Sequence, residues 1–339
     1  MDVPAWVWLV TIGGLAVLLA IDLFIVDRKP HEVGVGEATR WVVFYVICAV
    51  LFGLGVWHFS GGDFAFEYFA GYITEYSLSV DNLFIFVIIM ATFGVPAVHQ
   101  HRVLLVGVVL ALVMRGLFIA AGAALISRFS WVFYLFGALL IYLGWQQLRH
   151  TSGDDEYREN IALRLLRKLV PVTAEYHGTK LTAKLDGKRW VTPMLIVMLA
   201  IGTADLIFAL DSIPAIFGLT KEPFLVFTAN AFALMGLRQL YFLIGGLLSK
   251  LVYLHVGLGV ILGFIGIKLV LEALHDSGLP FVGPAQYPVP TVGIELSLGV
   301  IVGVLVVTTV ASLLKVRWDP AAAERAVRPP AEQAAKNAG

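Results

Sequence analysis

Long stretches without charged residues dominate this chain. Four of them contain no Asp, Glu, Lys or Arg, and they cover residues 3–21, 41–57, 129–148 and 296–314. A helix needs about 20 consecutive, mainly apolar residues to cross the hydrocarbon core of a membrane. Each stretch is therefore predicted to be a transmembrane helix. The chain is then an all-α, polytopic membrane protein whose first partner is the lipid bilayer.

Five further apolar stretches hold few charges and complete the predicted set of about nine spans. We expect these helices over residues 66–92, 103–127, 193–217, 223–248 and 251–272. Only 14% of all residues are charged, against about 25% in a soluble domain. Lys and Arg together equal Asp and Glu at 24 each, so no charge bias points to nucleic acid. We expect that this protein is not an enzyme and that it has no catalytic residue and no bound cofactor.

The basic residues predict how the chain is oriented. With the N-terminus outside, 19 of the 24 Lys and Arg residues fall in inner loops and the C-terminal tail, and two fall in outer loops. Because cytoplasmic loops carry an excess of positive charge, this pattern predicts an outer N-terminus and a cytoplasmic C-terminus. The polar loop before residue 193 is predicted to hold an amphipathic helix near Ile161 to Leu169 and a β-hairpin that turns at Asp186-Gly187. It is either a regulatory module or a basic linker.

Two groups of three predicted helices carry the same residue pattern. In the first helix of each group an acid precedes an aspartate by six residues, as Glu75 precedes Asp81 and Asp205 precedes Asp211. Later helices continue the match with Arg115 and Arg238, with Gly137 and Gly144 against Gly259 and Gly266, and with Gln146 and Lys268. Since three is odd, the two copies enter the bilayer from opposite sides. Many transporters have such inverted repeats, with the site near the membrane midplane.

The repeats divide the chain into six predicted parts. They are peripheral helices at 1–65, repeat 1 at 66–149, a cytoplasmic loop at 150–192, repeat 2 at 193–275, an outer loop and last helix at 276–318, and a disordered tail at 319–339. The glycines of the third helices are expected to let helices pack closely.

The charged residues inside the repeat helices cannot stand alone. An isolated ionised side chain at mid-bilayer costs about 2.5–3.5 kcal/mol, so four acids with Arg115, Arg238 and Lys268 would cost on the order of 20 kcal/mol. They must pair, protonate or hold a cation. The arginines could simply lock the bundle by neutralising two carboxylates. However, four acids exceed three bases, and Asp22 adds a fifth acid. A divalent cation or transferable protons would close this deficit.

Helical geometry sorts the polar residues of the first repeat helix into two faces. At about 100° per residue, Glu75, Ser79 and Asn82 lie within about 60° of one another. Ser77 and Asp81 lie on another face, roughly 120° away. One undistorted helix therefore cannot aim both of its acids at one point.

We predict a cation site between Asp81 and Asp211, which face each other across the pseudo-two-fold axis, with Asn82 and Ser212 as further ligands. Pro214 lacks the amide that would bond the Leu210 carbonyl, and this carbonyl would be an additional oxygen ligand. Glu75 and Asp205 are expected one turn or more away, as entry sites or proton carriers.

The candidate ligands are all oxygens, which suit Mg²⁺, Ca²⁺ and Mn²⁺ better than Cu(I) or Zn²⁺. Lys268 is either a tethered cation that fills the empty site or a structural partner of an acid.

Several motifs together resemble the signature of the tellurium-resistance protein C (TerC) family and its Alx branch. They are Glu75-x-Ser-Leu-Ser-x-Asp-Asn, Asp205-x-x-Phe-Ala-x-Asp-Ser-Ile-Pro-Ala, and the segments 186–193, 236–242 and 264–268. The resemblance implies export of manganese from the cytoplasm across the inner (plasma) membrane, with Glu75, Asp81, Asp205 and Asp211 as candidate metal residues. Gly202 stands where the family usually has a glutamate, so the second half-site is one charge poorer.

Two other classes of function stay open on the sequence. One is a non-transporting scaffold or stress sensor that uses the loop before residue 193. The other is an intramembrane aspartyl protease with Asp81 and Asp211 as its dyad, although the chain lacks a Gly-x-Gly-Asp segment. The sequence leaves the oligomeric state open.

Overall fold

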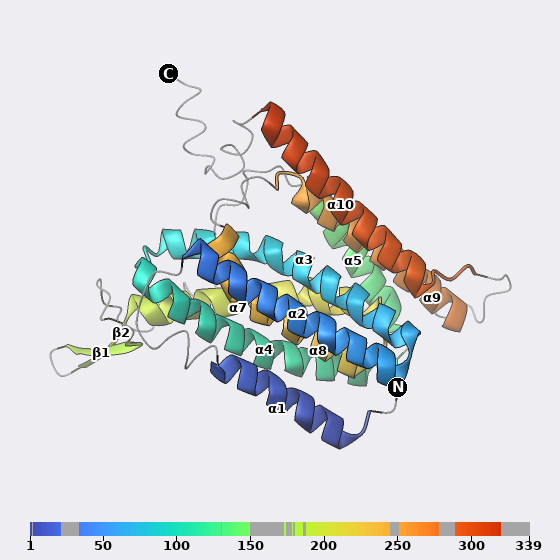
Figure 1. Cartoon of the computed structure of the whole chain (residues 1–339), viewed down its shortest axis with the longest axis horizontal. Coiled ribbons are helices and arrows are strands. Elements are labelled where there is room, and N and C mark those ends of the chain that lie inside the picture. The colour runs from blue at the N-terminus through green and yellow to red at the C-terminus, as the bar shows by residue number, and fades with distance from the viewer. Residues whose placement is uncertain are drawn as a thin grey trace.

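The computed structural model describes residues 1, 3–21, 34–129, 131–149, 173, 178, 180–185, 188–244, 251–277 and 289–319. Over these residues it has nine α-helices and one two-stranded sheet (Figure 1). The helices are α1 (Ala5–Ile21), α2 (Val35–Ser60), α3 (Gly62–Thr92), α4 (Ala97–Arg128), α5 (Val132–Arg149), α7 (Pro193–Phe217), α8 (Pro223–Ile244), α9 (Leu254–Ser277) and α10 (Ile294–Trp318). The predicted all-α, polytopic fold is confirmed.

Hydropathy locates the helices well but not their ends. α7 has the predicted bounds, whereas α2 and α4 begin several residues before the predicted residues 41 and 103. Their first turns hold polar residues such as Glu37 and His99, which a search for apolar stretches leaves out. Six described helices, α2, α3, α4, α7, α9 and α10, are long and apolar enough to cross a membrane, and α1 is a shorter apolar helix.

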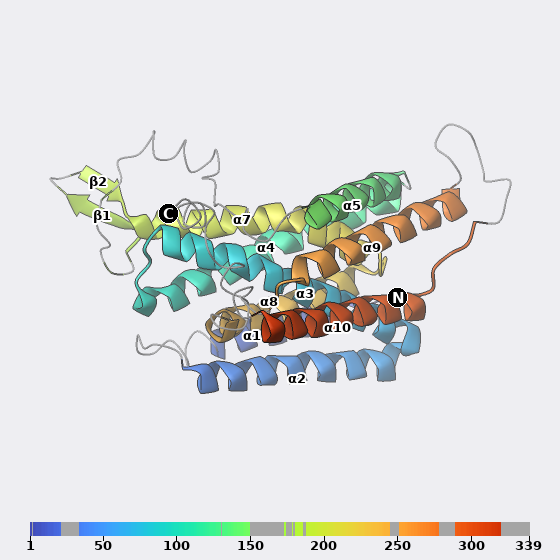
Figure 2. The same ribbon diagram turned by 90° about the horizontal axis from the view of Figure 1, so that it is seen from above.

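The outer helices expose apolar side chains. In the most apolar window of α2 only 22% of the residues are buried and in α10 only 17%, against 59% in α3. α2 packs on α8 and α3, while α10 packs on α9 and α3 (Figure 2). Such extended apolar surfaces fit contact with lipid. α3 therefore lies inside the bundle, where its charged residues are shielded.

The helix pairs follow the inverted repeat. α3 packs along α8, α4 packs along α7, and α5 packs along α9. Exchanging the two copies turns the α3–α8 pair into the α7–α4 pair and leaves the α5–α9 pair unchanged. The packing thus has the pattern that an internal two-fold axis produces. The predicted boundaries between the parts of the chain remain predictions.

Glycines set the closest approach of α5 and α9. A Cβ atom on Gly137 would lie 2.8 Å from the carbonyl oxygen of Gly266, and one on Gly266 would lie 2.8 Å from that of Gly137. Gly144 and Gly259 show the same relation at 2.7 and 2.9 Å. The repeat matches Gly137 with Gly259 and Gly144 with Gly266. Exchanging the two copies therefore turns the Gly137–Gly266 contact into the Gly259–Gly144 contact. The prediction that the four glycines serve helix packing is confirmed.

Two connections show how the sequence turns the chain. A single residue, Gly61, with φ of 103°, joins α2 to α3, and residues with a side chain rarely adopt such an angle. β1 (Thr182–Leu185) pairs antiparallel with β2 (Lys188–Val191), and Leu185 stands opposite Lys188. The predicted β-hairpin is confirmed, and it projects beyond one end of the bundle (Figure 1).

Some predictions lie outside the described residues. They concern Asp22, the turn residues Asp186 and Gly187, the amphipathic helix near Ile161 to Leu169, and the tail from residue 320.

Candidate cation site at the repeat interface

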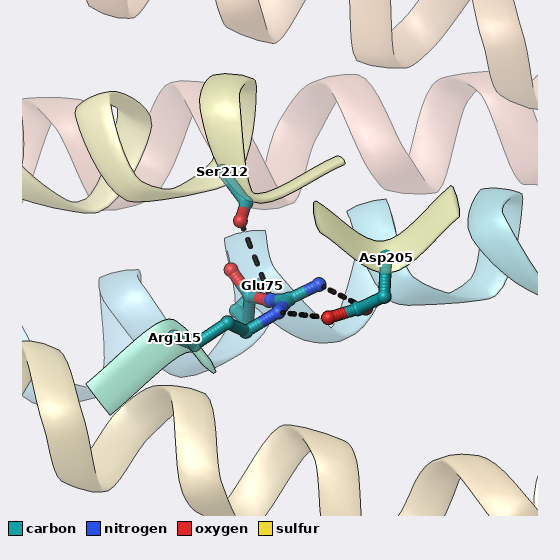
Figure 3. A network of polar contacts seen from close by, with 4 residues as sticks. All are labelled: Glu75, Arg115, Asp205 and Ser212. Carbon is teal, nitrogen blue, oxygen red and sulfur yellow. Dashed lines mark hydrogen bonds and ion pairs between the residues drawn. The ribbon is translucent and has the colours of Figure 1, made fainter. Parts of the chain in front are cut away.

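One arginine gathers acids from both repeats at the centre of the bundle. Arg115 of α4 binds Asp205 of α7 with two bonds, from Nη2 to Oδ1 at 2.9 Å and from Nε to Oδ2 at 3.2 Å (Figure 3). Nη1 of Arg115 forms an ion pair with Glu75 of α3 and donates a hydrogen bond to Oγ of Ser212 at 3.3 Å. The planar guanidinium suits this arrangement because it offers several donors in fixed directions.

The cluster is withdrawn from solvent and carries excess negative charge. Glu75 is 0% exposed, Arg115 is 1% exposed and Asp205 is 2% exposed. Two carboxylates face one guanidinium, so the group has one negative charge left if both acids are ionised. The hydroxyls of Thr74 and Ser79 are also buried on α3, without a hydrogen-bond partner in the described part of the chain. Carboxylate and hydroxyl oxygens are ligands that hard cations prefer.

The antiparallel crossing of α3 and α7 explains why these acids meet. Gly71 of α3 contacts Ile216 of α7, which puts Glu75 near the level of Ser212. The sequence analysis placed Glu75 and Asp205 at the margin of the site. The structure instead joins them through Arg115, because α4 lies against α7 and reaches the α3–α7 crossing.

Asp81 and Asp211 are a second pair of acids, less buried than Glu75 and Asp205. Oδ2 of Asp81 accepts a hydrogen bond from Nε2 of Gln147 in α5 at 2.9 Å. The charge of Arg115 attracts that of Asp211, and the charge of Asp81 repels it. Both side chains are half-buried. Gln147 was missed by the sequence analysis, which had singled out its exposed neighbour Gln146, and one residue changes the direction of a side chain by about 100°.

The remaining predicted residues have varied surroundings. Oγ of Ser77 donates to the carbonyl of Ile73 in its own helix at 2.6 Å, so it has a local role. Asn82 and Arg238 are buried, at 7% and 2% exposure. α7 continues as a helix past Pro214 to Phe217. Lys268 does not join the central acids, because it lines a pocket at one end of the bundle.

The described residues contain no group of three or more His, Cys, Asp or Glu side chains that could hold a metal ion. The predicted ligand set at Asp81 and Asp211 has only two such acids and stays a prediction, while Arg115 binds Glu75 and Asp205. Gly202 faces α4, where a Cβ atom would lie 2.5 Å from Cδ2 of Leu110. A glutamate at this position would require Leu110 to move.

Fold and site together define a multi-pass membrane protein with two related three-helix halves and charged residues buried where the halves meet. Comparison with known proteins identifies the family. Residues 60–319 match the integral membrane protein TerC family, and the chain belongs to it.

Curated relatives agree with this assignment. An "uncharacterized membrane protein", Rv2723 of Mycobacterium tuberculosis, is 47% identical over 323 residues, which cover 94% of this chain and 81% of the relative. The "putative membrane-bound redox modulator Alx" of Escherichia coli K12 is 35% identical over 303 residues, which cover 87% and 90% of the two chains. No solved structure matches the chain. The suspected kinship with the TerC family and its Alx branch is confirmed.

Proposed function

We propose that this protein is a secondary transporter that exports a hard divalent cation, most readily Mn²⁺, from the cytoplasm in exchange for protons. The observation that carries the proposal is the meeting of Glu75 and Asp205, equivalent acids of the two repeats, in a buried cluster. Purely structural neutralisation would need one base for each acid. Here one guanidinium binds two carboxylates, which leaves these three residues with one negative charge when both acids are ionised.

The residues suggest how a cation would be handled. A cation would first meet Asp81 and Asp211, because these side chains are half-buried whereas Glu75 and Asp205 are buried. A cation bound there would repel the guanidinium of Arg115. The ion pairs of Arg115 with Glu75 and Asp205 would then weaken. These acids would then bind the cation or take up protons. Arg115 therefore acts as the counter-charge that occupies the acids when no cation is present.

The proposed direction and the inner membrane follow from the resemblance to the family, and the basic loops predict a cytoplasmic C-terminus. The relatives named as redox modulators suggest a different activity. With Cys48 as its one cysteine, the chain cannot form an internal disulfide, so dithiol exchange within the chain is excluded. An effect on cellular redox state would then follow from the metal that the protein moves.

The test is metal uptake by inverted membrane vesicles, in which export from the cytoplasm is seen as accumulation. Vesicles that contain the wild-type protein should accumulate Mn²⁺ under a proton gradient and prefer it to Mg²⁺, Ca²⁺ and Zn²⁺. Asp81→Asn and Asp211→Asn should each abolish uptake while the protein still inserts. Glu295→Gln is the matched control, because Glu295 is an exposed acid in the first turn of the peripheral helix α10.

Transport at the wild-type rate in either aspartate variant would refute the assigned site. If the wild-type protein moves no cation at all, transport itself is refuted. The scaffold alternative then becomes the better account, and deletion of residues 180–191 should remove function. Cleavage of a single-span substrate, lost with either aspartate, would instead favour the protease.

A further inference from the structure

A second polar region lies at one end of the bundle, away from the Arg115 cluster. It is a pocket of about 510 Å³ between the start of α3, the α7–α8 connection, the last turns of α9 and the start of α10. In the orientation predicted from the loops, all these segments belong to the outer face. The charged residues that line the pocket are Asp63, Glu67, Lys221, Glu222, Lys268 and Glu272.

Two of its four acids already have a cationic partner. Oε1 of Glu272 pairs with Nζ of Lys221 at 2.8 Å, and Oε1 of Glu222 pairs with the amino terminus of Met1 at 2.6 Å. Asp63 and Glu67 remain, and they lie one turn apart on the same face of α3. Their mutual repulsion, together with that between Glu67 and Glu222, makes this wall of the pocket favourable for a cation.

Lys268 is the second observation that points to a ligand. Its side chain is 7% exposed and lines the pocket, yet it forms no hydrogen bond or ion pair with the described residues. Its charge acts on Glu67 and Glu272 only across a gap. A buried ammonium group without a direct partner costs free energy, so the ammonium of Lys268 requires negative charge nearby. Space remains between this ammonium and the carboxylates of the pocket.

The size of the pocket fits a hydrated ion. Six waters at about 30 Å³ each occupy roughly 180 Å³, which the pocket can hold. Glu67 is held in place because its Oε2 accepts a hydrogen bond from Oγ1 of Thr220 at 2.5 Å. Mg²⁺ usually keeps several waters and binds one or two carboxylates, and Mn²⁺ likewise favours carboxylate, carbonyl and water ligands. The pair Asp63 and Glu67 meets this requirement without a full set of protein ligands.

An apolar layer separates the pocket from the central cluster. Glu67 precedes Glu75 by eight residues, which is about 12 Å along a helix. Between them, Gly71 packs against Ile216 and Ala229, and Ala70 and Ile216 are completely buried. A cation in the pocket is therefore in a compartment distinct from that of the central acids in this conformation.

We propose that the pocket is a second cation site, which takes a hydrated divalent cation at Asp63 and Glu67 and in which Lys268 is the counter-cation of the empty state. As the site from which exported ions leave, it rests on the proposed function. As a binding site it stands on its own geometry. Lys268, a candidate tethered cation on the sequence, has this role at the pocket and not at the central acids.

Direct binding of Mn²⁺ to the purified, full-length protein in nanodiscs tests the proposal by titration calorimetry. Wild-type protein should bind Mn²⁺ at two classes of site. Glu67→Gln should remove one class and leave the other, whereas Lys268→Gln should tighten that class by roughly tenfold or more, since a like charge is removed. Glu295→Gln, an exposed acid at the same end of the bundle, is the control and should bind as wild type.

Unchanged Mn²⁺ binding in folded Glu67→Gln protein, or unchanged affinity in Lys268→Gln, would overturn the proposal. Should Glu67→Gln fail to fold, Lys268→Gln decides alone. A different result refutes the proposed function, namely that vesicles with the wild-type protein accumulate no cation. The proposal for the pocket is refuted if Mn²⁺ uptake requires Asp81 and Asp211 while Mn²⁺ binding is unchanged in the Glu67→Gln and Lys268→Gln variants.

Discussion

Replacing Arg115 by glutamine should destabilise the protein strongly. The substitution keeps a polar, though shorter, side chain and removes the charge that holds Glu75 and Asp205. Both carboxylates are then left without their cation at 0% and 2% exposure. Removing one partner of a buried ion pair costs about 3–5 kcal/mol, because the other charge remains unpaired in a poorly polarisable surrounding. Two acids lose a partner here, so the cost should lie at the upper end of this range.

The assay is the apparent melting temperature in detergent. A loss of this size should lower it by on the order of 10 °C. Arg128→Gln is the matched control, because Arg128 lies at the exposed end of the same helix and should change the melting temperature little. Adding Asp205→Asn to Arg115→Gln should restore part of the stability, since one of the two orphaned charges is removed.

A melting temperature of Arg115→Gln equal to that of Arg128→Gln would refute the reasoning. It would mean that the two acids are neutral in the folded protein, or that Arg115 does not neutralise them. Additive effects of Arg115→Gln and Asp205→Asn would refute the direct coupling, because contacting charges should give a non-additive result.

Two further predictions concern the packing and the second acid pair. Gly144→Ala should lower the melting temperature relative to Gly263→Ala by the equivalent of about 1–3 kcal/mol, because its Cβ would lie 2.7 Å from the carbonyl oxygen of Gly259, whereas a Cβ on Gly263 meets nothing within 4 Å. Equal melting temperatures would contradict the close packing of α5 and α9 at these glycines. Gln147→Leu should slow Mn²⁺ uptake by vesicles, because Asp81 loses its hydrogen-bond donor, whereas Gln146→Leu, at an exposed position, should not. Equal uptake rates in the two variants would show that this hydrogen bond has no role in transport.

The sequence was sufficient for the features that depend on local pattern. Apolar length placed the helices, and Asp186-Gly187 between two short apolar-alternating runs placed the hairpin. The repeat offsets identified Gly137 and Gly144 with Gly259 and Gly266, and these pairs are in contact. All these features are fixed by neighbours along the chain or by a comparison of the chain with itself.

The features that were missed depend on how helices are rotated and on where separate ends meet. Arg115 binds Glu75 and Asp205 because three helices cross at this point. The spacing of residues along one helix does not predict how helices cross. Glu67 has Val197 at its repeat position, so a search for duplicated acids passes it over. The pocket that it lines is formed by segments far apart in the chain.

Charge gives a reason why, under the proposed function, an arginine would share its site with a cation. Glu75 and Asp205 with Arg115 carry one net negative charge when both acids are ionised, and with a divalent cation in place of Arg115 they carry none. Without either, two buried carboxylates would remain, and this is the state that a membrane interior penalises most. In the proposed cycle, an exchange between Arg115 and a cation would avoid that state. The same reasoning applies to Lys268 near Glu67, so that in both proposed sites an arriving cation would replace a tethered positive charge.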